Sequence, residues 1–96
     1  MFWRRKKGKG IRFTGGAGDS LADAVKIEGA QLGSLATVER VYLSTRFGQQ
    51  GIDWKWKGQA LLVPSGRHYD EIRIELADGT RKKVYFDISD YFFPLV

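Results

Sequence analysis

The chain contains no cysteine, one histidine and two prolines. The absence of cysteine excludes disulfides, thiolate zinc sites and cysteine nucleophiles. A single histidine, His68, excludes a histidine-rich metal site, and we interpret it as an exposed residue at the start of a strand. No apolar run approaches the roughly 18 residues of a membrane span, and no apolar segment follows the basic N-terminus. We therefore expect a cytoplasmic protein with no transmembrane segment, no signal peptide, no metal and no cofactor.

Acidic residues are missing from the first twelve positions. Residues 1–12 hold six cations, so the remaining 84 residues carry ten basic and eleven acidic side chains. The chain's net charge of +5 therefore describes the N-terminus and not the body. A like-charged segment interrupted by glycine buries little apolar surface. We expect residues 1–12 to be a disordered basic arm and residues 13–96 to form a single domain.

The basic arm has two interpretations. An aromatic pair beside several cations can insert at an anionic membrane surface or stack on nucleotides. The arm can equally be a solvated tail that only raises solubility. The candidate polyanion-binding residues are Phe2, Trp3, Arg4, Arg5, Lys6, Lys7, Lys9 and Arg12.

Residues 53–88 are typical of three consecutive β-strands joined by short turns. Apolar and polar residues alternate in each run, which places the apolar side chains on one sheet face. Asp78-Gly79 supplies the positive φ angles of a tight hairpin turn, and Gly58 indicates a bulge or a bend. The residues expected on the apolar face are Trp54, Trp56, Ala60, Leu62, Ile72, Ile74, Leu76, Val84, Phe86 and Ile88.

The rest of the fold comes from one helix and one further strand. Apolar residues at helical spacing predict an amphipathic helix from Gln31 to Phe47, ended by Gly48. Val25 to Glu28 alternates and suggests a short strand at an edge of the meander. The sequence thus predicts an α+β domain: a short strand, one amphipathic helix, then a three-stranded antiparallel meander with the helix packed on one face.

Two charged residues, Glu39 and Arg46, lie within the apolar stripe of the predicted helix. One interpretation places them at the edge of the stripe, with both charged groups reaching water. The other makes Glu39 a half-buried carboxylate under a cleft, with a perturbed pKa.

The polar face of the meander mixes charges of both signs with two tyrosines. Tyrosines among cations resemble a platform for single-stranded nucleic acid, but a phosphate-binding surface is mostly of one sign. The mixture favours cross-strand ion pairs on a solvated face.

Asp87 and Asp90 flank Ser89, and we interpret this acidic group as a helix cap. The residues of a candidate surface site are Glu39, Tyr69, Tyr85, Asp87 and Asp90.

No motif in the sequence carries catalytic chemistry. Gly15 to Gly18 lacks the Lys-Ser/Thr of a phosphate-binding loop, and no serine lies in a nucleophile motif. We therefore expect a non-catalytic module that binds an unknown protein partner. The alternative is a protein whose arm contacts nucleic acid or anionic lipid.

Several short motifs between about Phe13 and Phe92 resemble a group of small uncharacterised bacterial proteins. The resemblance implies a bacterial, cytoplasmic domain of unknown function and attaches no activity to it. The motifs are Gly18-Asp19-Ser20, Asp23-Ala24-Val25-Lys26-Ile27-Glu28-Gly29-Ala30, Asp53-Trp54, Gln59 with Leu61, Gly66-Arg67-His68-Tyr69-Asp70, Ile74-Glu75-Leu76-Ala77-Asp78-Gly79 and Val84-Tyr85-Phe86-Asp87-Ile88.

Overall fold

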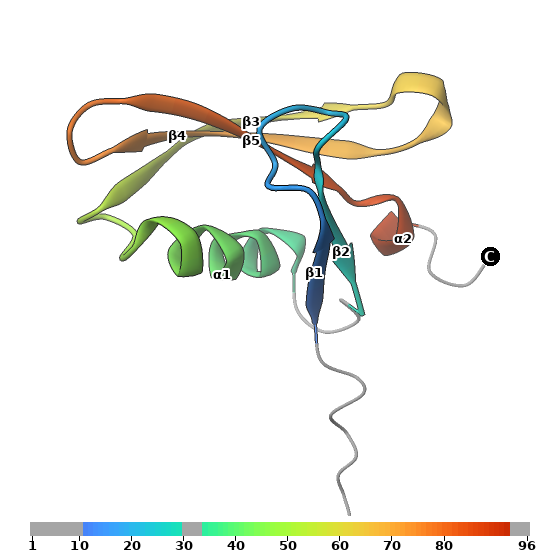
Figure 1. The fold of residues 1–96 in the computed structure, drawn as a ribbon, viewed down its shortest axis with the longest axis horizontal. Coiled ribbons are helices and arrows are strands. Elements are labelled where there is room, and N and C mark those ends of the chain that lie inside the picture. Colours follow the sequence, from blue (N-terminus) through green and yellow to red (C-terminus); the bar gives the residue numbers. More distant parts are fainter. Residues whose placement is uncertain (1–10, 30–33, 93–96) are drawn as a thin grey trace, which may run out of the picture.

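The computed structural model describes residues 11–29 and 34–92, which form one α+β unit (Figure 1). No helix within these residues is long and apolar enough to cross a membrane. The elements in chain order are β1 (Arg12–Gly15), β2 (Val25–Glu28), α1 (Leu35–Phe47), β3 (Trp54–Leu62), a 3-10 turn (Pro64–Gly66), β4 (Tyr69–Leu76), β5 (Arg81–Asp87) and α2 (Ser89–Phe92).

The strands form one five-stranded mixed sheet in the order β1-β2-β5-β4-β3. The predicted antiparallel meander is present as β3, β4 and β5, but it makes up only part of the sheet. β2 joins β5 in parallel through Val25↔Phe86 and Lys26↔Asp87. The sheet also contains β1, a strand that the sequence does not predict, which pairs antiparallel with β2 along its whole length.

The β4–β5 hairpin forms where the sequence predicts it. Gly79 has a φ angle of 89°, which a glycine adopts without steric cost. The backbone N–H of Leu76 donates to the carbonyl of Thr80 at 2.8 Å, and the Asp78 carboxylate accepts from the backbone N–H of Thr80 at 2.9 Å. These bonds set the register of the hairpin, which pairs Ile72 with Val84.

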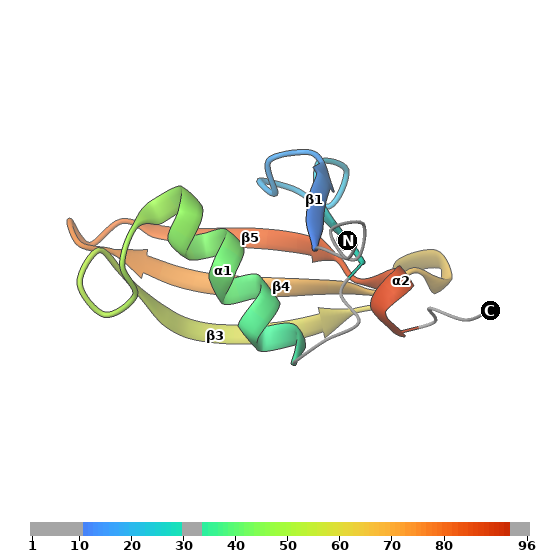
Figure 2. The same ribbon diagram turned by 90° about the horizontal axis from the view of Figure 1, so that it is seen from below.

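Helix α1 lies across β3, β4 and β5 on one face of the sheet (Figure 2). The helix begins later than the sequence predicts: the Ser34 hydroxyl caps it by accepting from the backbone N–H of Thr37 at 3.2 Å. The predicted start at Gln31 lies outside the described residues. Gly48 ends the helix with a φ angle of 109°, as expected. We call the sheet face under α1 the covered face and the opposite face of β3–β5 the open face.

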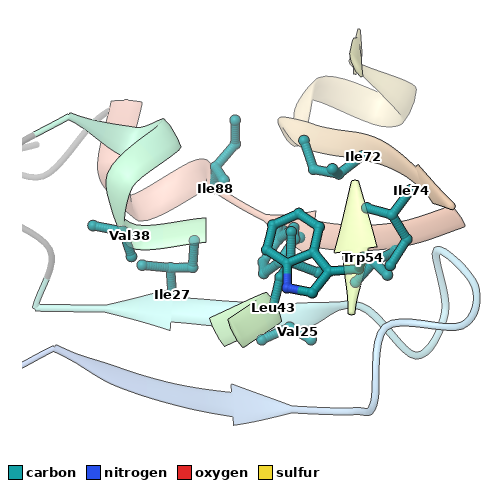
Figure 3. Packing of buried hydrophobic residues seen from close by; sticks show 10 residues of the cluster. Val25, Ile27, Val38, Leu43, Trp54, Ile72, Ile74 and Ile88 are labelled. Atoms are coloured by element: carbon teal, nitrogen blue, oxygen red, sulfur yellow. The ribbon is translucent and has the colours of Figure 1, made fainter. Parts of the chain in front are cut away.

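The core fills the space between α1 and the covered face (Figure 3). Trp54 is almost fully buried, and its indole N–H donates to the carbonyl of Gly48 at 2.8 Å. Trp56 is only partly buried, and the Arg40 guanidinium lies 4.7 Å from its ring centroid. The buried apolar cluster is Val25, Ile27, Val38, Leu43, Trp54, Ile72, Ile74, Val84, Phe86 and Ile88.

A bulge in β3 corrects part of the predicted face assignment. The β3–β4 register shifts between Trp56 and Gly58, which reverses the alternation beyond that point. Leu62 consequently pairs with Tyr69 and lies on the open face, whereas Gln59 pairs with Ile72 and lies on the covered face. The prediction of Ala60 and Leu62 on the apolar face is therefore wrong.

The loop between β1 and β2 is fastened both to α1 and to β5. Arg46 donates to the carbonyl of Ala17 and lies 3.5 Å from a carboxylate oxygen of Asp19. The backbone N–H of Tyr85 donates to the carbonyl of Gly18 at 2.8 Å. Arg46 is thus a link between elements, and Asp19 is held beside the middle of β5.

Candidate functional site

A cleft of about 800 Å³ lies on the described surface, and most of its side chains project from the open face. Residues 73, 81, 83 and 85 alternate with buried residues of β4 and β5, so their side chains point away from α1. We call this feature the cation-lined cleft. Its lining residues are Asp19, Lys57, Arg73, Ile74, Arg81, Lys82, Lys83 and Tyr85.

The cleft is strongly positive because only one of its lining residues is acidic. That acid, Asp19, lies 3.5 Å from Arg46 of α1. Arg73 pairs with Glu71 at 3.1 Å, and Lys57 pairs with Glu75 at 3.6 Å. No ion pair joins the remaining cations, Arg81, Lys82 and Lys83, to another described residue. The β5 end of the cleft therefore holds three cations without an ion pair to a described residue, although Glu75 lies opposite Arg81 in the register.

The β3 bulge shapes the floor of the cleft. An ideal Cβ at Gly58 would lie 2.5 Å from Nη2 of Arg73, so the guanidinium lies directly over the glycine. A residue with a side chain would displace it. The bulge and its glycine thus hold Arg73 flat against the open face, where it pairs with Glu71.

Tyr85 supplies the aromatic surface of the cleft. Burial, together with the neighbouring Glu71 carboxylate, raises the pKa of Tyr85 above its usual value. The hydroxyl therefore keeps its proton at neutral pH and can donate a hydrogen bond. The cleft thus combines cationic groups, one aromatic ring and one O–H donor.

The structure brings some of the sequence-predicted site residues together and separates others. Tyr69 pairs with Asp87, and Glu71 pairs with Tyr85 two residues along the same two strands. Tyr69, Tyr85 and Asp87 therefore lie next to one another on the open face. Asp90 lies beyond the sheet, in α2, with its carboxylate 3.6 Å from Lys26. Glu39 lies on the other side of the sheet.

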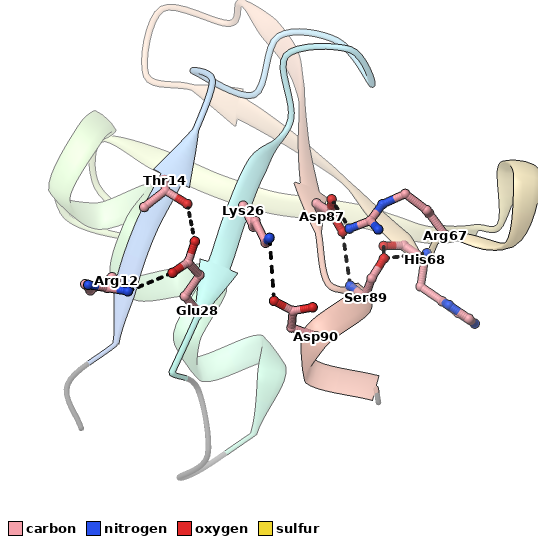
Figure 4. Close-up of polar contacts among 9 residues, drawn as sticks. All are labelled: Arg12, Thr14, Lys26, Glu28, Arg67, His68, Asp87, Ser89 and Asp90. Atoms are coloured by element: carbon pink, nitrogen blue, oxygen red, sulfur yellow. Dashed lines mark hydrogen bonds and ion pairs between the residues drawn. The ribbon is translucent and has the colours of Figure 1, made fainter. Parts of the chain in front are cut away.

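The acidic group near the chain end is a structural network (Figure 4). Asp87 accepts from the backbone N–H of Ser89 at 3.1 Å, as expected for a cap, and pairs with Arg67 at 2.7 Å. Partial burial acts to raise the Asp87 pKa, but the hydrogen bonds from Arg67 and Ser89 outweigh it and leave that pKa below its usual value. The Ser89 hydroxyl accepts from the backbone N–H of His68 at 3.0 Å.

Glu39 is fully buried, so the expectation that it lies at the edge of the stripe is wrong. Asp70 of β4 is also buried, and its two carboxylate oxygens accept from the Gln59 amide at 3.3 and 3.2 Å. No donor among the described residues reaches either carboxylate oxygen of Glu39. Burial, reinforced by Asp70, raises the pKa of Glu39 to about 10. Glu39 therefore keeps its proton at neutral pH and can donate it to the Asp70 carboxylate.

The buried carboxyl pair is not accessible to a ligand, because Glu39 has no exposed surface in the folded domain. We assign Glu39 and Asp70 to the packing of α1 on β4. In the described part of the chain, no group of three or more histidine, aspartate or glutamate residues is placed to hold a metal ion.

Only one of the predicted polyanion-binding residues falls within the described residues. Phe2 to Lys9 lie outside them. Arg12 is the first residue of β1 and pairs with Glu28 at 2.8 Å (Figure 4). The hydrogen bond from Thr14, followed by that from Arg12, lowers the pKa of Glu28. Arg12 thus joins β1 to β2.

The alternation of the strands predicts that Lys57, Arg73, Lys83 and Tyr85 share the polar face, but it does not predict that they group into a cleft. It predicts no part in the site for Arg81 and Lys82. The run Arg81-Lys82-Lys83 directly after the hairpin turn was the available signal. Asp19 carried no such signal, because its position depends on contacts with α1 and β5.

Comparison of the chain with models of known protein families, with curated proteins and with solved structures gives no match. The resemblance to small bacterial proteins stays a prediction.

Proposed function

We propose that this chain is a non-catalytic module that binds another protein through the open face of β3–β5. One observation carries the proposal: the cation-lined cleft is positive along β5, where Arg81 and Lys83 project from the open face and have no ion pair with described residues. Unpaired cations around a partly apolar hollow complement an acidic surface. The cytoplasmic location expected from the sequence belongs to the same proposal.

The composition of the cleft supports binding over catalysis. Its lining contains no serine, threonine, cysteine or histidine. Asp19, the single carboxylate, lies beside Arg46, and Tyr85 has a raised pKa. A nucleophile with an adjacent base is the usual requirement for covalent catalysis, and this lining offers none.

The test compares partners captured from native lysate by three baits. Wild type and Lys55→Glu should retain the same partner, whereas Lys83→Glu should lose it. Lys55 is the matched control because it is an exposed lysine on the same face and does not line the cleft. Identical partners for all three baits would contradict the proposal.

A fourth bait addresses the alternative, in which the basic arm binds nucleic acid or anionic lipid. It should lack residues 1–10 only, because removing Arg12 would also remove its ion pair with Glu28. Under the proposal, this truncated bait keeps the partner. Loss of all partners on truncation would favour the arm.

A further inference from the structure

The N-terminal half of β5 is a free sheet edge beside the cation-lined cleft. β2 pairs with β5 only at Phe86 and Asp87, and the next contact is the hydrogen bond from Tyr85 N–H to Gly18. Figure 2 shows β1 and β2 beside the C-terminal half of β5 alone. No described strand pairs with the outer side of residues 81–84.

The register shows which backbone groups face this edge. In an antiparallel ladder, successive residues point their N–H and C=O groups alternately toward and away from the partner strand. The bond between Leu76 and Thr80 places the even-numbered β5 residues toward β4, and Tyr85 N–H points away to Gly18. The N–H and C=O groups of Arg81 and Lys83 therefore point outward.

The same two residues place their side chains on the open face. Arg81 and Lys83 are exposed and line the cleft together with Arg73 of the neighbouring strand. A strand added to this edge would have alternate side chains on the same face. Acidic residues at those positions would lie next to Arg81 and Lys83 and would form cross-strand pairs of opposite charge with them.

We infer that the partner presents an acidic segment in extended conformation, which adds as a strand to β5 at Arg81–Lys83. This inference rests on the function proposed above and names its partner. Backbone hydrogen bonds to Arg81 and Lys83 hold the segment, and the cleft selects its acidic side chains. The occupant is a peptide segment of another protein.

Two features favour this occupant over a nucleic acid and this edge over β3. A phosphate backbone has no N–H groups to pair with the outward-facing carbonyls of Arg81 and Lys83, whereas a peptide segment in extended conformation has them. The β3 edge is interrupted by the bulge at Lys57–Gly58, and its start is occupied by the bond from Gly51 to Trp54. Bulges disrupt regular pairing.

Charged residues on a strand edge also protect proteins from edge-to-edge aggregation. The protective role requires only that the edge repel other strands. Strand addition by an acidic segment requires, in addition, hydrogen bonds at the amides of Arg81 and Lys83. The two roles therefore differ in a measurable way.

The experiment measures amide hydrogen exchange in the full-length chain, labelled with ¹⁵N. The probe is an eight-residue peptide of alternating glutamate and valine, and the control replaces glutamate by lysine. With saturating glutamate peptide, exchange of the Arg81 and Lys83 amides should slow by at least about tenfold. The Lys82 and Val84 amides, which already face β4, should change little, and the lysine peptide should have no effect.

Substitutions and a modified peptide give a second measurement. Lys83→Glu should weaken binding of the glutamate peptide by roughly tenfold or more, whereas Lys55→Glu should change it by less than about twofold. A glutamate peptide with N-methylated alternate residues keeps its charge but loses backbone donors. It should bind more weakly than the unmodified peptide.

The outcomes separate this inference from the proposed function. Peptide binding without protection of Arg81 and Lys83 overturns strand addition but leaves the open face as the binding surface. Tighter binding of oligothymidylate, with displacement of the peptide, replaces the peptide partner by a nucleic acid. If the glutamate peptide does not bind but a lysate partner still depends on Lys83, the inference of strand addition is overturned and the proposed function stands. If no lysate partner depends on Lys83, the proposed function fails as well.

Discussion

The two faces of β3–β5 are built from alternate residues of the same strands, yet they differ in almost every property. On the covered face, Ile72, Ile74 and Phe86 are almost completely buried. On the open face, Glu71, Arg73 and Lys83 remain partly or fully exposed and charged. Apolar burial is the dominant favourable contribution to folding, so stability should depend mainly on the covered face. The open face is then free to carry a binding function.

The sharpest test of this division uses one aromatic residue from each face. Trp54→Ala should lower the free energy of unfolding by about 3–5 kcal/mol, because it leaves a cavity between α1 and the sheet. Tyr85→Ala, on the open face, should cost about 1 kcal/mol or less. Urea unfolding followed by circular dichroism measures both. Equal losses would show that the open face is itself packed against something.

Trp56 gives an intermediate case. It is partly buried and lies beneath the Arg40 guanidinium, so Trp56→Ala should cost less than Trp54→Ala. Iodide should quench Trp56 fluorescence more readily than Trp54 fluorescence in the single-tryptophan variants.

The buried acid Glu39 should make the covered face sensitive to alkali. The folded pKa of about 10 is far above the usual glutamate value of 4.5 that applies to the unfolded chain. Between these values the folded state holds a proton that the unfolded chain releases, so stability falls as pH rises. The contribution is about 1.4 kcal/mol per pH unit when one group dominates. Glu39→Gln cannot ionise, and its amide can still donate to Asp70.

Urea unfolding at pH 5, 7 and 9 tests this expectation. The Glu39→Gln variant should lose stability with pH much less steeply than wild type and should be the more stable protein at pH 9. Glu71→Gln is the matched control from the open face and should leave the slope unchanged. Parallel profiles for wild type and Glu39→Gln would show that Glu39 ionises as readily in the folded state as in the unfolded chain.

The comparison of the faces also explains what the sequence could predict. β2 has the predicted bounds, Val25–Glu28, and the alternation around Ile72 and Ile74 correctly predicted the covered face of β4. These features are local, because period-two alternation and a tight turn are encoded within a few residues. The same alternation failed beyond Gly58, since one inserted residue reverses every later side chain.

The features that the sequence did not predict depend on contacts between distant segments. β1 contains one apolar residue, Phe13, and is held by pairing with β2, so it has no alternating pattern of its own. Glu39 was correctly placed in the helical stripe, but its burial depends on where Asp70 of β4 lies. The sequence shows a mixture of charges on the open face but not the cleft, because Glu71 and Glu75 pair with Arg73 and Lys57 and leave Arg81 and Lys83 without an ion pair among the described residues.

The smallest expected effect concerns the ion pair between Asp87 and Arg67 on the open face. Because the Asp87 pKa is lowered in the folded state, its contribution to stability is present above the usual carboxyl pKa and is lost as pH falls through the folded value. The Arg67 side chain is about half exposed, so solvent screening limits the contribution to about 1 kcal/mol or less.

Asp87→Asn isolates this charge, since asparagine can still accept from the backbone N–H of Ser89 and cap α2. The variant should lose a few tenths of a kcal/mol at pH 7, and the difference from wild type should vanish near pH 2. The Asp90→Asn variant removes the ion pair with Lys26, in which the carboxylate is more exposed than that of Asp87. It should lose still less free energy of unfolding. A loss above about 2 kcal/mol in Asp87→Asn would mean that this end of the open face supports the fold and is not free for binding.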